Sequence, residues 1–418
     1  RGLLEESVRL RLISDVPLGV FLSGGVDSSA LALLMRRVSR EQVKAFTISF
    51  ADKKFDEGEQ ARQTAEALGV EYHPILLTEA EMLASYADAI KALDQPSIDG
   101  VNTYHVSRAV KRAGMTVALS GLGGDEAFCG YNHFRTIPRM ERFINQWKRL
   151  PLGLRHLGAS MLRGDGYGRN AKLRALMTGD YGFAHTYFLS RTLFLPEGIA
   201  ALLDPSAMLA IDYGSWARRL KLMMGRARAL DPINCISYLE FKNYIPNTLL
   251  RDTDVMSMAH SLEVRVPLLD HLLLEAVMSL PGRLKLDPKM PKPLLVRSLP
   301  EALPAGVISG PKRGFVLPYA KWLHGKLRAE VEESFAHPPA ALDGIVNREG
   351  VQAVWRSFLD GQCSWTRPWS MFVLYQVVER LFDSSGDMHE VDFDRQRIEA
   401  ASAVSHDDAS VECAPVAP

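Results

Sequence analysis

The sequence predicts an α/β fold, a doubly wound parallel sheet followed by a mostly helical region. Three observations indicate this. In the first 133 residues, short apolar segments alternate with segments of helical spacing, which is typical of parallel βαβ units. Glycine-rich turns follow the first and the last of the expected strands. From about residue 134 the strand signals fade and helical spacing dominates.

The expected elements of the sheet region follow one another in the first part of the chain. They are helix 1–13, strand 20–22, helix 28–38, strand 43–50, helix 56–68, strand 72–77, helices 79–93 and 103–113, and strand 116–119. The helix over 56–68 ends at Gly69, the residue type that most often closes a helix. Ligands of such sheets bind at the carboxyl ends of the strands, so both glycine-rich turns are expected at one edge.

The rest of the chain is expected to pack on this sheet. Helical spacing predicts helices over residues 138–150, 173–189, 216–224, 233–244 and 271–280. We therefore divide the chain into a sheet core (1–133) and a helical remainder (134–385) that does not form an independent domain. Residues 386–418 show scattered charges and no periodicity, which predicts a disordered tail.

Composition restricts the partners and the compartment. The 418 residues include 49 Lys and Arg and 49 Asp and Glu, so no basic field favours nucleic acid. The four cysteines are widely separated, which favours a reducing cytoplasm. Since no apolar run reaches membrane-spanning length, we expect no membrane partner. The chain opens at Arg1 inside a helical pattern, so we expect it to be a piece of a longer protein.

The first glycine-rich turn has the features of an anion site. It contains Ser23, Gly24, Gly25, Asp27 and Ser28 between an apolar strand and a helix start. Free backbone N–H groups converge at such a helix start, and glycines let the backbone curl around a phosphate. A carboxylate there requires a cation beside it, so Asp27 predicts Mg²⁺ shared with phosphate oxygens. The alternative is a plain turn with a helix cap.

The second glycine-rich turn repeats this arrangement. Ser120, Gly121, Leu122, two further glycines, Asp125 and Glu126 follow the last expected strand. A carboxylate pair close to a bound anion again implies a cation. By itself this segment is equally consistent with a turn whose acids cap a helix. Two such turns on one sheet favour a shared site.

Five segments carry a resemblance to a known family. They are residues 23–29, 93–114, 120–131, 257–271 and 311–315. In this order they resemble the synthetase domain of glutamine-dependent asparagine synthetases, whose first loop is that of the N-type ATP pyrophosphatases. The resemblance covers residues 1 to about 385 and implies an adenine-nucleotide α-hydrolase-like fold. Related amide-forming enzymes, such as β-lactam synthetases and lasso-peptide cyclases, share this plan.

The resemblance implies an ATP-dependent ligase. In the family, ATP activates a side-chain carboxylate with release of pyrophosphate, and ammonia then gives the amide and AMP; for this chain the resemblance implies aspartate as the carboxylate. Phosphate binding is implied for Ser23, Gly24, Gly25, Asp27 and Ser28, adenine and ribose contacts for Phe21, Leu22, Ile48, Ser120 and Gly121, and Mg²⁺ binding for Asp27 and Asp125. Glu126 is expected to orient the site, and Lys312 to stabilise the transition state as a fixed cation.

Other candidates have simpler interpretations. Without the resemblance, Lys312 with its neighbour Arg313 is a solvated basic pair. His260 and His271 are expected to be packing residues, and Met256 and Met258 core residues. An ion-pair network that braces the helical region against the sheet is expected from Arg251, Asp254, Glu263 and Arg265. Asp94 is expected on the substrate side of the site.

Two departures from the family leave the substrate open. Aspartate-amidating members tend to carry an acid at the third position of the second turn, where this chain has Leu122. An apolar side chain cannot pair with an ammonium group. The glutaminase half, with its N-terminal cysteine nucleophile, is missing here and is expected upstream or on a separate chain.

Three functions are therefore considered. The first is an asparagine-synthase-like ligase that uses ATP, Mg²⁺, ammonia and a small carboxylate, with a homodimer as its expected assembly. The second is a related amide synthetase with another acceptor. The third is a nucleotide-binding module without turnover, against which both acidic turns and Lys312 argue.

Overall fold

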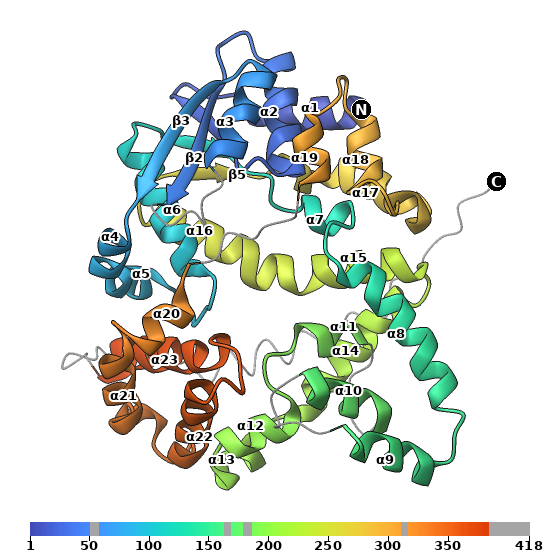
Figure 1. Ribbon diagram of the computed structural model, residues 1–418, viewed down its shortest axis with the longest axis vertical. Helices are drawn as coiled ribbons and strands as arrows, with labels where there is room; N and C mark the ends of the chain where they lie inside the picture. The colour runs from blue at the N-terminus through green and yellow to red at the C-terminus, as the bar shows by residue number, and fades with distance from the viewer. Residues whose placement is uncertain (51–57, 163–168, 179–185, 311–316, 384–418) are drawn as a thin grey trace, which may run out of the picture.

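The computed structural model describes residues 1–50, 58–162, 169–178, 186–310 and 317–383 (Figure 1). Its centre is a five-stranded sheet in the order β3-β2-β1-β4-β5, and every pair is parallel. The strands are β1 (Leu18–Phe21), β2 (Lys44–Phe50), β3 (Glu71–Leu77), β4 (Val117–Leu119) and β5 (Glu263–Arg265). The predicted doubly wound parallel sheet is confirmed.

Both glycine-rich turns lie at one end of the sheet, one after β1 and the other after its neighbour β4. Val20 of β1 is level with Ala45 of β2 and with Leu119 of β4, so β1 and β4 end side by side. The N–H of Leu22 still donates to the carbonyl of Phe46 at 2.8 Å, which extends the pairing to the start of the first turn. The turns after β1 and β4 therefore meet, as we expected from a parallel sheet.

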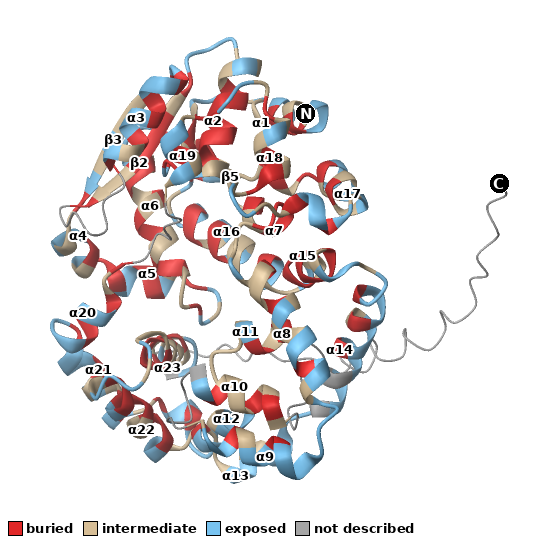
Figure 2. Cartoon of the chain, turned by 45° about the vertical axis from the view of Figure 1, so that its right-hand side comes forward, coloured by how far each residue is buried: buried red, intermediate tan, exposed pale blue. Residues whose placement is uncertain are grey.

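Helices cover both faces of this sheet. They are α1 (Gly2–Arg11), α2 (Val26–Val38), α3 (Gly58–Leu68), α4 (Glu79–Ala84), α5 (Tyr86–Ala92), α6 (Gly100–Arg112) and α7 (Gly124–Ala127), joined later in the chain by α17 (His271–Ser279), α18 (Pro293–Ser298) and α19 (Ala305–Ser309). One core holds Val20 and Ala45 with apolar side chains of α1, α2, α3, α17, α18 and α19. Phe46, next to Ala45, points to the other face and packs on Val110 of α6. Helix α2 is mostly buried (Figure 2).

Most of the remaining helices form two groups below the sheet in Figure 1. One group comprises α8 (His133–Trp147), α9 (Leu152–Ser160), α10 (Arg169–Thr178), α11 (Thr186–Arg191), α12 (Pro196–Leu202), α13 (Pro205–Ala210), α14 (Tyr213–Ala227) and α15 (Pro232–Lys242), and the other α20 (Tyr319–His324), α21 (Arg328–Ala336), α22 (Arg348–Leu359) and α23 (Thr366–Val378). Helix α16 (Leu250–Met258) packs on α6 and leads into β5. Among the described residues, no helix is long and apolar enough to cross a membrane.

The sequence patterns place most elements correctly but miss some boundaries. The short strand β5 was not expected, because its three residues lack the length that distinguishes a strand from a loop. The helix predicted over 79–93 is two helices, since a second helix begins after Ser85. Helix α8 begins at His133 rather than at Pro138, which it contains. The start of the helix over 56–68, the middle of that over 173–189 and the tail 386–418 lie outside the described residues.

The two methionines that we predicted in the core differ in how far they are buried. Met256 is fully buried, and its side chain lies against Gly100, where an added Cβ would be 2.9 Å from the methionine Cε. Met258 is 54% exposed at the end of α16, so its assignment to the core was wrong. A methionine two positions further along a helix faces away from the first one.

These two methionines form a matched pair for a stability test. We expect Met256→Ala to lower the free energy of unfolding by about 2–4 kcal/mol, because it opens a cavity between α6 and α16. Met258→Ala is expected to change it by less than about 0.5 kcal/mol. Urea unfolding followed by circular dichroism measures both values. Equal losses for the two variants would contradict the burial described here.

Candidate functional site

The turn after β1 is held in shape by its own hydroxyl groups. The N–H of Ser23 donates to Oγ of Ser28 at 3.2 Å, and Oγ of Ser28 donates to the carbonyl of Gly25 at 3.2 Å. Gly24 has a φ of +72°, a conformation that favours glycine. Nε2 of Gln60 on α3 donates to the carbonyl of Gly24 at 3.1 Å. The N-terminus of the 13-residue helix α2 is thus presented in a fixed loop, as an anion site requires.

Glycines of the second turn make room for Asp27. A Cβ on Gly121 would lie 2.8 Å from Cβ of Asp27, and a Cβ on Gly124 would lie 2.5 Å from its Cγ. Gly123, with a φ of +87°, starts α7 in the left-handed conformation. From the sequence these glycines were interpreted as room for a ligand. In the structure, Gly121 and Gly124 bring the two turns together.

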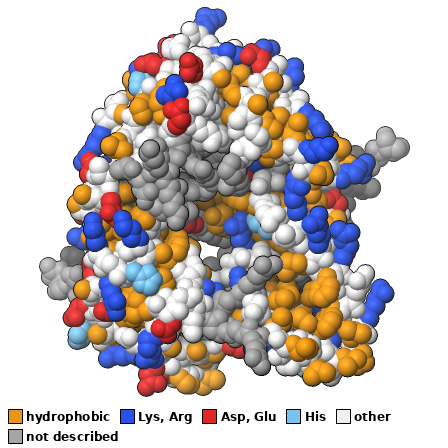
Figure 3. All heavy atoms as spheres, viewed as in Figure 1, with side chains coloured by type: hydrophobic (Ala, Val, Ile, Leu, Met, Phe, Trp, Pro, Cys, Tyr) orange, Lys and Arg blue, Asp and Glu red, His pale blue; other side chains and the backbone are white. Residues whose placement is uncertain are grey.

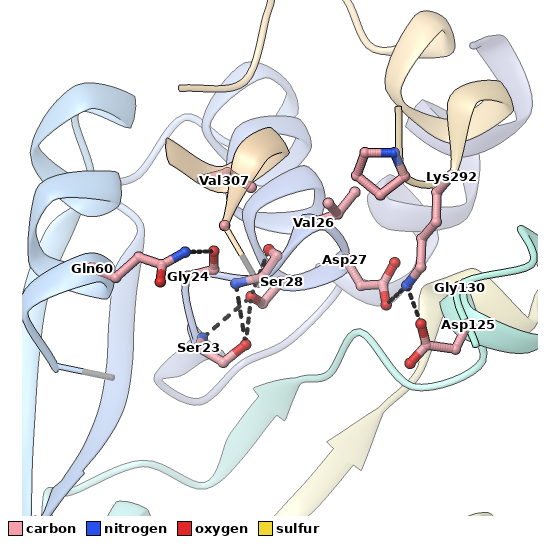
Figure 4. A pocket seen from close by; sticks show the side chains of 13 residues that line it. Ser23, Gly24, Val26, Asp27, Ser28, Gln60, Asp125, Gly130, Lys292 and Val307 are labelled. Carbon is pink, nitrogen blue, oxygen red and sulfur yellow. Dashed lines mark hydrogen bonds and ion pairs between the residues drawn. The ribbon is translucent and has the colours of Figure 1, made fainter. Parts of the chain in front are cut away.

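Lys292 connects the two turns (Figure 4). Its Nζ contacts Oδ1 of Asp125 at 2.6 Å and also Oδ2 of Asp27, and its side chain is 6% exposed. Lys292 precedes Pro293, the first residue of α18, and has a φ of +46°, which is unusual for a residue with a side chain. Such backbone strain is often found at functional sites.

The three charged groups line one cavity of about 190 Å³. Its walls are Ser23, Gly24, Gly25, Val26, Asp27, Ser28, Gln60, Asp125, Gly130, Pro291, Lys292, Val307 and Gly310. The lining residues come mainly from the turn and start of α2, from α3, α7 and α19, and from the residues just before α18 (Figure 4). Backbone N–H groups and hydroxyls lie on one side, with the carboxylates and the lysine on the other. This combination suits a phosphate group with a cation.

The charged groups that the structure describes in this cavity are one ammonium group and two carboxylates, so the negative charge is in excess. Burial alone would lower the pKa of Lys292, but the carboxylates of Asp27 and Asp125 outweigh this and raise its pKa. The charged form of Lys292 is therefore favoured in this cavity. Since both carboxylates contact one nitrogen atom, they converge closely enough to suit Mg²⁺, which takes one or two carboxylates together with phosphate oxygens.

Glu126 points away from this cavity into a buried polar cluster. Its carboxylate accepts a hydrogen bond from the hydroxyl of Tyr131 at 2.8 Å, and the side chain is buried. Burial, with the charge of Asp125 adding to it, raises the pKa of Glu126 to about 7. Glu240 anchors the neighbouring part of the cluster by accepting hydrogen bonds from Tyr187 at 3.1 Å and from Arg191 at 2.6 Å. The cluster joins α7 to α11 and α15.

Comparisons with known proteins identify the family of this chain. A profile of the family described as asparagine synthase matches residues 1–379. The chain belongs to the asparagine synthase family. It is 28% identical over 333 residues to asparagine synthetase [glutamine-hydrolyzing] 1 of Bacillus subtilis. The aligned part covers 78% of this chain and 50% of that relative.

Two further relatives show how wide the family is. A putative asparagine synthetase of Mycobacterium bovis is 28% identical over 406 residues, 90% of this chain and 57% of its own length. The amidase chyE of Penicillium rubens is 28% identical over 325 residues, 68% of this chain and 46% of its own length. The chain therefore spans about half the length of the curated relatives it matches.

Four residues that the family resemblance assigned to the adenine and ribose lie outside the lining of the described cavity. Leu22 is buried in the sheet core, and its carbonyl accepts a hydrogen bond from Thr47 at 2.7 Å. Phe21 and Ile48 are partly buried and pack on apolar clusters beside the sheet. The N–H of Ser120 donates to the carbonyl of Arg265 at 2.8 Å. None of these four lines the described cavity.

The residues expected on the substrate side lie outside the described cavity too. Leu122 is partly buried, and its N–H donates to Oγ of Ser120 at 3.4 Å. Asp94 is paired with Arg251 of α16 at 2.8 Å, and both side chains are about two-fifths exposed, at 42% and 43%. Neither residue lines the cavity of Figure 4.

The predicted ion-pair network is two separate pairs. Arg251 pairs with Asp94, whereas Arg265 pairs with Glu263 on the same strand at 2.6 Å. Arg265 also donates to the carbonyls of Arg11 at 2.8 Å and Ile13 at 2.7 Å, so it ties the end of α1 to β5. Asp254 makes no ion pair with any residue that the structure describes. The expected single network was wrong because Arg251 pairs with Asp94, outside the predicted set, and Arg265 pairs within its own strand.

One of the two histidines agrees with its expected packing role. His260 packs against the ring of Tyr104 with 4.2 Å between ring centroids. His271 is exposed at the start of α17, so the expectation that it packs inside the structure was wrong.

Two lysines differ in how far the sequence predicts them. Lys312 lies outside the described residues, two positions after Gly310, which lines the cavity. Lys292 was missed altogether. Its only local signal is its place directly before a proline that begins a helix. That signal identifies a helix start but not a contact with residues more than 160 positions away.

A buried carboxylate on α16, that of Asp252, makes the stability of the fold depend on pH. Asp252 is 5% exposed and accepts a hydrogen bond from Ser97 at 2.5 Å. Burial raises its pKa from 3.8 to about 6, against the opposing effect of the Ser97 hydrogen bond. Folding therefore shifts this group toward its protonated form relative to the unfolded chain.

Replacing Gly124 tests the contact between the turns. We expect Gly124→Ala to reduce ATP-dependent pyrophosphate release by roughly tenfold to a hundredfold, because the new methyl group displaces the Asp27 carboxylate. Gly225→Ala in α14 is the matched control, since nothing lies within 4 Å of its added Cβ. A phosphate-coupled pyrophosphate assay compares them. Equal activity in both variants would contradict the close packing of the turns.

Replacing Asp252 tests the effect of its burial. The pKa of Asp252 is higher in the folded than in the unfolded chain. Its contribution to the free energy of unfolding is therefore fully present below about pH 3.8 and is lost as the pH rises to about 6. Asp252→Asn does not titrate. We expect wild type to lose up to about 3 kcal/mol relative to this variant between about pH 4 and pH 6. Urea unfolding at several pH values measures the difference, and parallel profiles would refute it.

Proposed function

We propose that this chain is the synthetase part of an ATP-dependent amide-forming ligase. It activates a carboxylate, that of aspartate or a related acid, with ATP and transfers the acyl group to ammonia. The observation that carries the proposal is the convergence of Asp27, Asp125 and Lys292 beside the N-terminus of α2. Membership of the asparagine synthase family supports it.

The cavity has the groups needed to hold the leaving pyrophosphate. We infer that the backbone N–H groups of residues 23–28, with the hydroxyls of Ser23 and Ser28, bind the β and γ phosphates. Asp27 and Asp125 would hold Mg²⁺, which supplies positive charge to the leaving pyrophosphate. Lys292 is placed to neutralise the same charge from the protein side.

Two chemical steps follow in this proposal. An oxygen of the substrate carboxylate attacks the α phosphorus of ATP, the bond to the β-phosphate oxygen breaks, and pyrophosphate leaves. Ammonia then attacks the activated carbonyl carbon, AMP departs with the bonding electron pair, and the amide loses a proton. Lys312 is assigned to the first step, where two anions approach each other. Its position two residues beyond Gly310 supports this assignment.

The acyl acceptor is the open part of the proposal. We favour aspartate on the family assignment, but Leu122 offers no charge to an amino group. This observation favours a second candidate, an amide synthetase that acts on another carboxylate. The amidase name of one relative supports the alternative only weakly.

The remaining parts of the proposal concern the whole protein. We propose that ammonia comes from glutamine through a glutaminase domain upstream or on another chain, that the protein forms a homodimer, and that it works in the cytoplasm. We also propose the division into a sheet core (1–133), a helical remainder (134–385) and a tail (386–418). The partial coverage of the relatives supports a missing domain.

One experiment tests both the reaction and its lysine. We incubate the chain with ATP, Mg²⁺, ammonium and either aspartate or a panel of other carboxylic acids, and measure AMP, pyrophosphate and amide. We expect pyrophosphate release that depends on one acid. Lys292→Met is expected to reduce kcat/KM by roughly a hundredfold or more, because a buried cation is lost from the phosphate site.

Lys289→Met serves as the control for Lys292→Met. Lys289 lies three positions earlier and is exposed, so its variant is expected to keep full activity. Melting temperatures establish that both variants are folded. The proposal fails if no acid in the panel stimulates pyrophosphate release, or if the two variants are equally active.

A further inference from the structure

The outward face of α9 is apolar. Leu150, Leu154, Leu157 and Met161 recur at the spacing of one helical stripe, and they are 41%, 54%, 63% and 79% exposed. A helix on the surface of a globular protein normally turns its apolar stripe inward. Here the stripe faces outward.

The opposite face of α9 fixes this orientation. Arg155 is buried, and its guanidinium donates to the carbonyl of Met177 at 3.2 Å and to that of Thr178 at the end of α10. Gly158 lies against the indole of Trp147, where an added Cβ would be 2.9 Å from the ring. If α9 turned its leucines inward, the arginine would lose its buried partners. The exposure of the stripe is therefore built into the packing.

Two further exposed side chains widen the stripe into a patch. Phe143 on α8 is 47% exposed and Leu152 at the start of α9 is 58% exposed. We call these six residues the α8–α9 patch: Phe143, Leu150, Leu152, Leu154, Leu157 and Met161. Figure 3 shows apolar side chains gathered at the lower right, where α8 and α9 lie in Figure 1. A contiguous apolar patch of this kind marks an interaction surface.

Within residues 133–162, the charged side chains that are exposed are basic. Arg139, Arg142, Lys148 and Arg149 are exposed within the same segment. The only acid among residues 133–162 is Glu141, whose carboxylate accepts a hydrogen bond from the N–H of Thr186 at 3.0 Å. The net charge of the whole chain is zero, so this is a local excess of positive charge. A binding partner complementary to the α8–α9 patch offers an apolar interior beneath a negatively charged surface.

We propose that the α8–α9 patch docks on the surface of an anionic phospholipid bilayer. Leucine, phenylalanine and methionine side chains would enter the boundary between headgroups and acyl chains, while the four basic side chains contact acidic headgroups. This goes beyond the proposed function and does not depend on it. It replaces our expectation that the protein has no membrane partner, since that expectation considered only spanning segments.

The patch is separate from the cavity. In Figure 1, α9 lies at the lower right. Helix α2, which contains Asp27, and helix α18, which begins directly after Lys292, lie at the top. Docking through α9 therefore leaves the cavity accessible to the aqueous phase.

Sedimentation with vesicles tests the proposal. The full chain is mixed with vesicles of phosphatidylcholine alone or with about 30 mol % phosphatidylglycerol. We expect binding to the anionic vesicles, weakening as salt rises, and at least tenfold weaker binding to the neutral ones. Leu154→Glu/Leu157→Glu is expected to reduce binding to anionic vesicles at least tenfold, and so is Arg142→Glu/Lys148→Glu/Arg149→Glu.

The control variant carries the same change at the other end of the molecule. Leu10→Glu/Leu272→Glu alters leucines that are 49% and 52% exposed on α1 and α17, and it is expected to bind like wild type. Circular dichroism establishes that each variant is folded. The proposal is overturned if wild type binds neither vesicle, if the leucine variant binds like the control, or if gel filtration shows that the leucine variant dissociates a dimer, since a second copy then covers the patch.

Discussion

The ion pairs between Lys292 and the carboxylates of Asp27 and Asp125 are the contacts on which the candidate site depends. They join the start of α2, the start of α7 and the start of α18 at a single nitrogen atom. Removing charged groups from water is costly, so a buried pair is poor evidence for stability by itself. The contribution of these ion pairs is positional, because the lysine fixes both acids beside the turn that follows β1.

The sheet supplies the geometry that these contacts need. β1 and β4 are neighbours and parallel, so their following turns emerge together. Glycine at 121 and 124 allows the second turn to touch Asp27, and Gly130 leaves space for the side chains of Asp125 and Lys292. The left-handed backbone of Lys292 directs its side chain toward the acids from the opposite side. Topology, small residues and one strained residue thus cooperate.

The sequence was most informative where a function is encoded locally. The strand, turn and helix pattern around Asp27 and Asp125 predicts both the sheet and the edge at which the turns meet. Lys292 could not be predicted in this way, because its partners lie 265 and 167 positions away and no periodicity connects them. β5 is too short for a pattern, and Met258 was misplaced because residue type says little about the face it occupies. The leucines of α9 resemble a core stripe in sequence, and only the buried contacts of Arg155 show that they face outward.

The order in which the three charged residues occur along the chain affects how the protein can mature. During synthesis, the two acidic turns emerge from the ribosome long before Lys292, and the final strand β5 also comes late. The early part of the nascent chain therefore carries two neighbouring negative charges and an unpaired edge of β4, which non-local contacts must later satisfy. A shortened product that ends before β5 lacks both the last strand and Lys292, the side chain that holds Asp27 and Asp125 together in the whole chain.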